Sequence, residues 1–502
     1  MNRPTAILRQ GLPIRYVWLA LPPVMAFIAL NLTPLKEGDL WLHIKIGEQI
    51  SDLHRIPSAD VFTFTAWGTP YDFSNSWLSG LLLYFFEKTG GMATLVLIQS
   101  VVGVATVALI LRESLRRGAR PAVAAVLTSV GWLGFYPFGS ARPQIFSFLL
   151  FATLSVILSD YLKRRRNHLW LMPVLMVLWV NLHPSWPLGL ALIGVGTVSS
   201  VLINSRRGSV ARLKPLFYWG AAALVAVFAN PDGLGVYSNV LAVSANPIVQ
   251  RSISEWQPLV ITNRLSWPFL FIAAAWILGL VAARKRPALD DILVMLLVAT
   301  LSLRYMRMLP YFFAAATPIA AGVLSRTNWR AALARIEGHA HEEGHSVPHA
   351  RQINLAFLVV LGSLAILSLP RIRVDLFSRD ETTLISPHFP VSSVSALEKN
   401  LEPGTKLYNT AEWGGYIIWR LNPQGLVFVD GRVELFPPGV WDDYFTIAAA
   451  RDDWTAFLDE YGVDYLILDK DRQARLVSNA GRYGWGLVAE DEVAVIFHRK
   501  PR

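Results

Sequence analysis

The segment EGDLWLHIKIGEQI, residues 37–50, directly follows the first long apolar run of the chain. It interleaves acidic residues and a histidine with large apolar residues, which recur at helical spacing on one face. We therefore predict a helix over 39–53 that begins at Asp39 and lies flat on the outer surface of a membrane, with Trp41 at the interface. Helix capping alone would account for Asp39, because Asp is a favoured N-cap residue, but capping does not exclude catalysis.

The composition excludes an ordinary water-soluble domain. Of 502 residues, 53% are hydrophobic and 16% are charged, whereas soluble domains carry about a quarter of charged residues. The net charge of +10 is compatible with nucleic-acid or membrane binding. Most basic clusters lie between apolar runs, which is the pattern of a membrane protein. The chain has no Cys, which excludes disulfides and thiolate chemistry.

About eleven apolar runs are long enough to cross a bilayer, which requires about 20 mostly apolar residues. They lie near residues 14–34, 91–111, 121–138, 144–162, 169–185, 187–204, 214–230, 267–283, 288–303, 308–325 and 353–370. The stretch WLSGLLLYFF, residues 77–86, is too short to cross and predicts a helix lying in the interface. We therefore predict a polytopic α-helical membrane domain over residues 1–370.

The loops between these runs alternate in basic character. Lys and Arg are concentrated before the first run and in the segments 112–120, 163–166, 205–214, 284–286 and 326–352. Because cytoplasmic loops carry the excess of Lys and Arg, these segments and the N-terminus are predicted to be cytoplasmic. The long loop 35–90, the loop 231–266 and the tail then lie outside.

The tail, residues 371–502, is predicted to be a separate soluble α/β domain. Its strand-like runs are 425–431, 463–469 and 492–499, and a helical stretch at 452–462 separates the first two. This order of strand, helix and strand is typical of a small α/β fold.

An ordered set of motifs runs along the chain. After the acidic segment come ARPQIFSFLLF, WVNLHPSWPLG, ANPDG, SEWQP, YNTAEWGGYIIWRL and VFVDGRVELF. Together these resemble a bacterial branch of the GT-C superfamily of membrane glycosyltransferases with a soluble C-terminal domain. The resemblance implies a polyprenyl-phosphate-linked sugar donor, a lipid, glycan or protein acceptor, and a location in the bacterial inner (plasma) membrane.

The resemblance also implies that Asp39, the acidic residue of the first outer loop, is the catalytic carboxylate. Many relatives have a second acid directly adjacent, whereas here the neighbour is Gly38 and Glu37 lies one residue further away. This departure puts a paired-carboxylate or metal-holding role in doubt, and the sequence does not indicate a metal.

A phosphate leaving group is already a good anion, so the site requires nearby cations and hydrogen-bond donors rather than a general acid. Candidate substrate-binding residues lie at the outer ends of the runs or in the outer loops. They are Glu37, His43, Arg142, Asn181, His183, Asp232, Arg304 and Arg307. Arg304 and Arg307 are predicted to share one helical face. The alternatives are a solvated Glu37, a packed His183, and arginines that only anchor the spans at the headgroups.

Two sets of residues in the tail have open interpretations. Asp430, Arg432 and Glu434 follow a strand, where they could act in a site or form a surface turn with ion pairs. Glu412 and Trp413 could open a helix or face a sugar, and Trp413 could instead pack in a core.

The competing motif HEEGH, residues 341–345, fits the zinc-protease pattern. It lies in a predicted cytoplasmic loop with neighbouring Gly and Pro residues that disfavour the required helix, so a His-rich loop is the simpler interpretation. A non-catalytic scaffold or a lipid-sugar transporter with a similar shell is a further alternative. No Gly-rich nucleotide-binding loop is present, which argues against a nucleotide-sugar donor.

Overall fold

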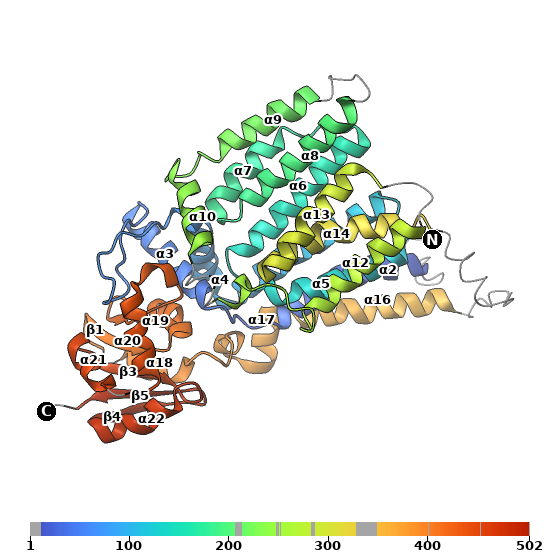
Figure 1. The fold of residues 1–502 in the computed structure, drawn as a ribbon. Helices are drawn as coiled ribbons and strands as arrows, with labels where there is room; N and C mark the ends of the chain where they lie inside the picture. Colours follow the sequence, from blue (N-terminus) through green and yellow to red (C-terminus); the bar gives the residue numbers. More distant parts are fainter. Residues whose placement is uncertain are drawn as a thin grey trace.

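A computed structural model describes residues 12–205, 213–246, 250, 253–282, 287–327, 349–399, 401–451 and 453–500. Long helices pack side by side into a bundle, and a smaller sheet domain lies at one end of it (Figure 1). Each of the eleven predicted runs coincides with a helix. These are α2 (Ile14–Leu32), α4 (Trp77–Arg116), α5 (Pro121–Phe135), α6 (Gln144–Arg164), α7 (Leu171–Leu182), α8 (Pro187–Ser205), α9 (Leu213–Ala226), α12 (Ser266–Ala282), α13 (Leu289–Arg304), α14 (Leu309–Leu324) and α16 (Ala350–Leu367).

By length and apolar composition alone, six helical segments of the described residues can cross a membrane. They contain α2, α4, α5, α6, α14 and α16. Helices α7, α8, α9 and α12 are apolar but shorter over their described residues. The bundle is therefore that of a polytopic membrane protein.

Helix α4 combines two predicted elements. It runs from Trp77 to Arg116, but Gly91 interrupts the helical backbone with φ 65° and ψ −163°. Only Gly adopts this conformation at little cost, since the position needs a positive φ. The segment before Gly91 corresponds to the predicted interfacial helix at 77–86, and the segment after it corresponds to the predicted span.

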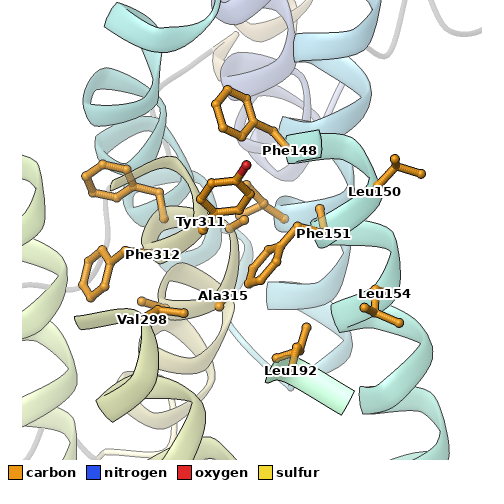
Figure 2. Packing of buried hydrophobic residues seen from close by; sticks show 14 of the residues in the cluster. Phe148, Leu150, Phe151, Leu154, Leu192, Val298, Tyr311, Phe312 and Ala315 are labelled. Carbon is orange, nitrogen blue, oxygen red and sulfur yellow. The ribbon is translucent and has the colours of Figure 1, made fainter. Parts of the chain in front are cut away.

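Helix α14 is the centre of the bundle. Every residue from Leu309 to Val323 is buried. The ring of Tyr311 packs edge-on against Phe148 and Phe151 of α6, with both centroid distances at 5.2 Å. Figure 2 shows this aromatic cluster with Val298 of α13 on its other side. Burial of large apolar side chains on this scale fixes the relative positions of α6, α13 and α14.

Helix α3 (Gly38–Leu53) differs from its prediction. It begins at Gly38, with Glu37 at the N-cap position, so Asp39 lies in the first turn and is not the cap. Trp41 is fully buried and contacts the rings of Phe389, Tyr416 and Trp419. The position of α3 flat on the membrane surface stays a prediction, but the predicted interface position of Trp41 is wrong, because α3 packs between α4 and α19 (Gly414–Leu421) of the sheet domain and buries this side chain.

The sheet domain contains five strands in the order β2-β1-β3-β5-β4. Strand β1 (Thr405–Asn409) is parallel to β2 (Gly425–Val427) and to β3 (Tyr465–Asp469). Strand β5 (Ala494–Arg499) is antiparallel to β3 and to β4 (Trp485–Glu490). The predicted α/β character is confirmed, and the predicted helix at 452–462 corresponds to α21 (Trp454–Tyr461). Strands β1 and β4 were not predicted.

Helices cover the sheet, and they account for most of the domain that the sequence did not predict. They are α18 (Val391–Glu398), α19, α20 (Pro438–Ala448), α21 and α22 (Ala474–Ala480). A short helix, α17 (Pro370–Arg373), connects this domain to α16.

The loop after α3 forms part of the sheet domain. Thr63 bridges Val427 at the edge of β2, and Phe64 packs against Phe428 at 5.6 Å between ring centroids. The first turn of α3 also packs directly against α19. A β-carbon at Gly415 would lie 2.3 Å from the carbonyl oxygen of Gly38. Real β-carbons essentially never approach so closely, so Gly at 415 is required for this contact. The two domains therefore meet at the residue before Asp39.

Candidate active site

A cavity of about 370 Å³ lies where α3, α10 (Gly235–Ala245) and the sheet domain meet. One wall is apolar and includes Leu188, Val240 and Val243. The polar and charged lining residues come from six separate segments of the chain. They are Asp39, His43, Tyr71, Asp72, Asn75, Ser76, Ser185, Asn239, Ser244, Arg307, Arg432 and Glu434.

Asp39 projects into this cavity from the first turn of α3, and its side chain is accessible there. Among the described residues, none donates a hydrogen bond to its carboxylate. The enclosing protein raises the pKa of Asp39 to about 6, mainly by desolvation, with the cation of Arg142 opposing the shift and Glu37 adding to it. A carboxylate of this kind is a stronger base than an ordinary aspartate and is still largely ionised at neutral pH.

Arg142 lies behind Asp39, outside the cavity lining. Its guanidinium binds Glu255 at 2.6 Å and approaches Glu37 at 3.5 Å. The hydroxyl of Ser140 donates to the other oxygen of Glu37 at 2.6 Å. The carboxylates hold the pKa of Arg142 above its usual value despite its burial. Glu37 is therefore only partly exposed, and its charge is matched by Arg142.

Arg307 is the cation that faces the cavity without a carboxylate partner in the described part of the chain. Its guanidinium carbon lies 4.4 Å from the ring centroid of Trp256, which also lines the cavity. The short helical turns that carry the two residues are joined by a hydrogen bond from the Met306 amide to the Gln257 carbonyl, at 3.0 Å. A guanidinium remains charged at neutral pH.

Arg304 does not accompany Arg307. Helix α13 ends at Arg304, Tyr305 is extended with φ −143° and ψ 118°, and a new 3₁₀ turn then begins at Met306. The predicted shared helical face is therefore wrong. Arg304 is exposed and stacks over Tyr305.

His43 lines the cavity one turn after Asp39. Burial, with a smaller contribution from the Arg432 cation, lowers the pKa of His43 to about 4, so the ring is neutral at physiological pH. His183 is buried beside the cavity, where its Nδ1 lies 2.8 Å from the hydroxyl of Ser185. Burial and the nearby arginines lower the pKa of His183 as well. Both histidines can therefore offer hydrogen bonds but no charge.

Asn181 serves the structure of the bundle. Its Oδ1 accepts a 2.7 Å hydrogen bond from the indole of Trp77, and its Nδ2 donates to the carbonyl oxygens of Val177 and Ala229. The side chain does not line the cavity. Asn181 thereby ties α7 to the start of α4.

Sequence analysis left the role of the loop after β2 open, and the structure places this loop against Asp39. Arg432 binds the buried carboxylates of Asp60 at 2.6 Å and Asp430 at 2.5 Å. Neither acid is exposed to solvent, so this is an interior ion triad and not a surface turn. Arg432 and Glu434 reach the cavity, and Glu434 accepts a 2.8 Å hydrogen bond from Tyr71.

Burial and the neighbouring Glu434 raise the pKa of Tyr71, so this phenol remains protonated as the donor. Tyr71 and Asp72 are cavity residues that sequence reasoning did not select. A tyrosine and an aspartate in a long polar loop give no signal until the loop folds against the sheet domain.

A second depression, which we call the side groove, opens beside the cavity and shares Tyr71 and Asp72 with it. Asp232, predicted as a substrate contact, lies in the side groove and not in the cavity. The remaining tail residues lie elsewhere. Trp413 is buried in the domain core and donates to the carbonyl of His388, while Glu412 is exposed and pairs with Arg472.

The motif HEEGH at 341–345 lies outside the described residues. Within the described residues, no group of three or more His, Asp and Glu side chains is arranged to hold a metal ion.

Comparisons with known proteins give a consistent result at the level of structure. No protein-family model and no curated protein sequence matches the chain. Among solved structures, the oligosaccharyltransferase of Archaeoglobus fulgidus in its apo form is similar, with a TM-score of 0.54 and 12% identity, over 94% of this chain and 73% of that one.

Two further structures are similar over nearly the whole chain. ArnT from Cupriavidus metallidurans bound to undecaprenyl phosphate has a TM-score of 0.52 and 14% identity, over 97% of this chain and 99% of that one. The arabinofuranosyltransferase AftD from Mycobacteria has a TM-score of 0.52 and 15% identity, over 98% of this chain and 40% of that one. This chain therefore shares the fold of these three solved structures, and it is a polytopic helical membrane protein with a C-terminal α/β domain.

Proposed function

We propose that this protein transfers a sugar from a polyprenyl-phosphate-linked donor to an acceptor hydroxyl at the outer face of the bacterial inner membrane. The observation that carries the proposal is that Asp39 and Arg307 face one cavity with an apolar wall. A donor of this class needs the same three features: a base for the acceptor, a cation for the phosphate and an apolar surface for the prenyl chain.

The proposed chemical step is one displacement. The Asp39 carboxylate accepts the proton of the acceptor hydroxyl, whose oxygen forms a bond to the anomeric carbon of the donor. The bond between that carbon and the phosphate oxygen breaks, and the electron pair leaves with the polyprenyl phosphate. The pKa of about 6 suits Asp39 to this task, because a base is most effective when its pKa lies near the working pH.

Arg307 is proposed to bind the donor phosphate. Arg142 is less suited, because Glu37 and Glu255 already neutralise it. Arg307 has no such partner among the described residues and lies against Trp256, which also limits its freedom. The solved structure of ArnT bound to undecaprenyl phosphate supports this class of lipid carrier.

The side of the membrane follows from charge. The cavity lies beside the N-terminal end of α3, in a loop that is poor in Lys and Arg, whereas the described basic segments 112–120 and 163–166 follow the C-terminal ends of α4 and α6. Asp39 and the sheet domain are accordingly proposed to be outside, and the N-terminus inside.

The test uses the full chain in lipid nanodiscs. Undecaprenyl phosphate binding is measured by native mass spectrometry, and turnover is measured as polyprenyl phosphate released from a panel of polyprenyl-phosphate-linked sugars. The proposal expects binding that depends on Arg307 and release that depends on Asp39. Binding without release from any donor, with or without added acceptors, would instead favour a scaffold or a transporter.

A further inference from the structure

A short 3₁₀ turn, Ser254–Trp256, lies beside the proposed site and carries Glu255. The ring of Trp256 packs edge-on against the ring of Tyr305, at 5.7 Å between centroids, and against the guanidinium of Arg307. The hydrogen bond that joins this turn to the turn of Arg307 is a second anchor. The backbone that carries Glu255 is therefore fixed by the segment that follows α13.

Glu255 is the main partner of Arg142, the cation behind Asp39. The Arg142 guanidinium donates through Nη2 to Glu255 at 2.6 Å, whereas its Nη1 reaches Glu37 only at 3.5 Å. The third nitrogen, Nε, is buried without a hydrogen-bond partner among the described residues. The Arg142 side chain is 9% exposed, so little water can replace a lost partner. Without Glu255, the charge of Arg142 would retain one marginal contact with a carboxylate.

Asp39 is the carboxylate that an unpaired Arg142 would attract. Desolvation raises the pKa of Asp39 to about 6, and the Arg142 cation is the main influence in the opposite direction. Glu255 counteracts that cation, together with Glu37 and Glu434. The other charged or titratable residues of the same cavity are His43, Tyr71, Asp72, Arg307 and Arg432. Opposite charges attract strongly at a buried site, so Arg142 would pair with Asp39 once Glu255 is lost.

An ion pair with Arg142 would weaken Asp39 as a base. A carboxylate beside an arginine loses affinity for a proton, and its pKa falls toward or below the ordinary value of about 3.9. Its oxygens would also be occupied by the guanidinium, whereas an acceptor hydroxyl needs one of them free. The pairing of Arg142 with Glu255 therefore favours catalysis by Asp39.

Resting on the function proposed above, we propose that Glu255 is a positioning residue for the sugar transfer: it keeps Arg142 from pairing with Asp39 and so leaves the base free for the acceptor hydroxyl. Glu255 does not line the cavity, so it acts through Arg142 and not on a substrate. The same turn presents Trp256 to the proposed phosphate cation, Arg307. One short turn thus contacts both halves of the proposed site.

The experiment titrates Asp39 directly and needs no turnover. Full-length protein in nanodiscs is studied by infrared difference spectroscopy over a range of pH, and the C=O stretch of protonated Asp39 is identified by its loss in Asp39→Asn. The wild type should titrate at about 6. Glu255→Gln keeps the size of the side chain but removes its charge, so the midpoint should fall toward about 3.9. Release of polyprenyl phosphate at neutral pH should fall about ten-fold, a part of the roughly 10²–10⁴-fold that a positioned base contributes.

A double variant identifies the route of the effect. In the Arg142→Gln background, Glu255→Gln should lower the midpoint little, because the cation that would pair with Asp39 is gone. The single variant decides on its own if the double variant does not fold. Glu398→Gln is the matched control, because Glu398 binds Arg420 at the same distance of 2.6 Å and does not line the cavity. It should change neither the midpoint nor the release.

The proposal is overturned if the midpoint in Glu255→Gln stays the same or rises, if the fall is equally large in the double variant, or if Glu398→Gln has the same effect. A lowered midpoint in a protein that releases polyprenyl phosphate from no donor counts against the proposed function alone. Release that depends on Asp39, together with an unmoved midpoint in Glu255→Gln, counts against the positioning role alone.

Discussion

Gly431 of the sheet domain lies directly against Asp39 of the membrane domain: a β-carbon at residue 431 would lie 3.0 Å from Oδ1 of the carboxylate. Any larger residue would occupy space beside the proposed base. The loop after β2 therefore forms one side of the site around Asp39, and the two domains share one cavity.

Asp39→Asn should separate catalysis from stability. Asn keeps the shape but cannot accept a proton, so release of polyprenyl phosphate should fall by roughly 10²–10⁴-fold. The melting temperature should rise or stay constant, because the substitution removes a carboxylate whose raised pKa disfavours the charged form in the folded state. Glu37→Gln is the control and should cost much less activity, since it lies outside the cavity. Full activity in monodisperse Asp39→Asn protein would refute the assignment.

The pH dependence should follow the same group. Because the pKa of Asp39 is about 6 and the base must be ionised, the rate at saturating donor should fall as the pH is lowered through about 6. His43, with a pKa of about 4, is neutral throughout this range and should not contribute. The residual rate of Asp39→Asn should not change with pH over roughly one unit on either side of the Asp39 pKa. A wild-type profile that is already flat there would contradict the proposed base.

Arg307→Gln should weaken undecaprenyl phosphate binding by about 10–100-fold, because a charged hydrogen bond to phosphate contributes roughly 1.5–3 kcal/mol. Arg304→Gln is the matched control, since Arg304 is three residues away but exposed outside the cavity. Native mass spectrometry over a range of lipid concentrations gives both dissociation constants. Equal losses in the two variants would mean that the arginines act only through the membrane surface.

Arg432→Met should destabilise the sheet domain by about 3–5 kcal/mol, because it leaves the buried carboxylates of Asp60 and Asp430 without their cation. Arg420→Met, which removes a cation paired with the partly exposed Glu398, should cost at most about 1 kcal/mol. Differential scanning fluorimetry and limited proteolysis of the outer domain report the difference. Similar melting temperatures for the two variants would show that the triad is energetically neutral.

Cysteine labelling can determine the orientation, since the native chain has no Cys. Single cysteines at Thr69 and Ser478, both exposed, should react in intact cells with a membrane-impermeant maleimide. A cysteine at the exposed Asn167, in a predicted cytoplasmic loop, should react only after lysis. Labelling of residue 167 but not of residues 69 and 478 in intact cells would invert the proposed orientation.

The spans were predictable because each needs only local information, namely a long apolar run. The α/β class of the sheet domain was predictable for the same reason, because strand-like and helical runs are also local. The short strand β1 was not predicted. It lies at the centre of the parallel part of the sheet, where burial of Leu407 and Tyr408 depends on neighbours distant in sequence.

The errors share one physical cause. Trp41 looks like an interface anchor until Phe389, Tyr416 and Trp419 are brought against it by the fold. Arg304 looks equivalent to Arg307 until the helix breaks at the extended Tyr305, where the Met306 amide donates to the distant Gln257 carbonyl. Such contacts depend on residues tens to hundreds of positions away, and local periodicity carries no information about them.

The packing of α3 between α4 and α19 has a consequence for biogenesis. Lys45 of α3 donates a 2.8 Å hydrogen bond to the carbonyl of Asn422, a residue 377 positions later in the chain. The ribosome therefore releases the helix that carries Asp39 long before its docking partner exists. In the proposed orientation, Trp41 and its apolar neighbours stay exposed outside the membrane until the sheet domain has been translocated and folded. The site around Asp39 can therefore be completed only after the sheet domain has been synthesised.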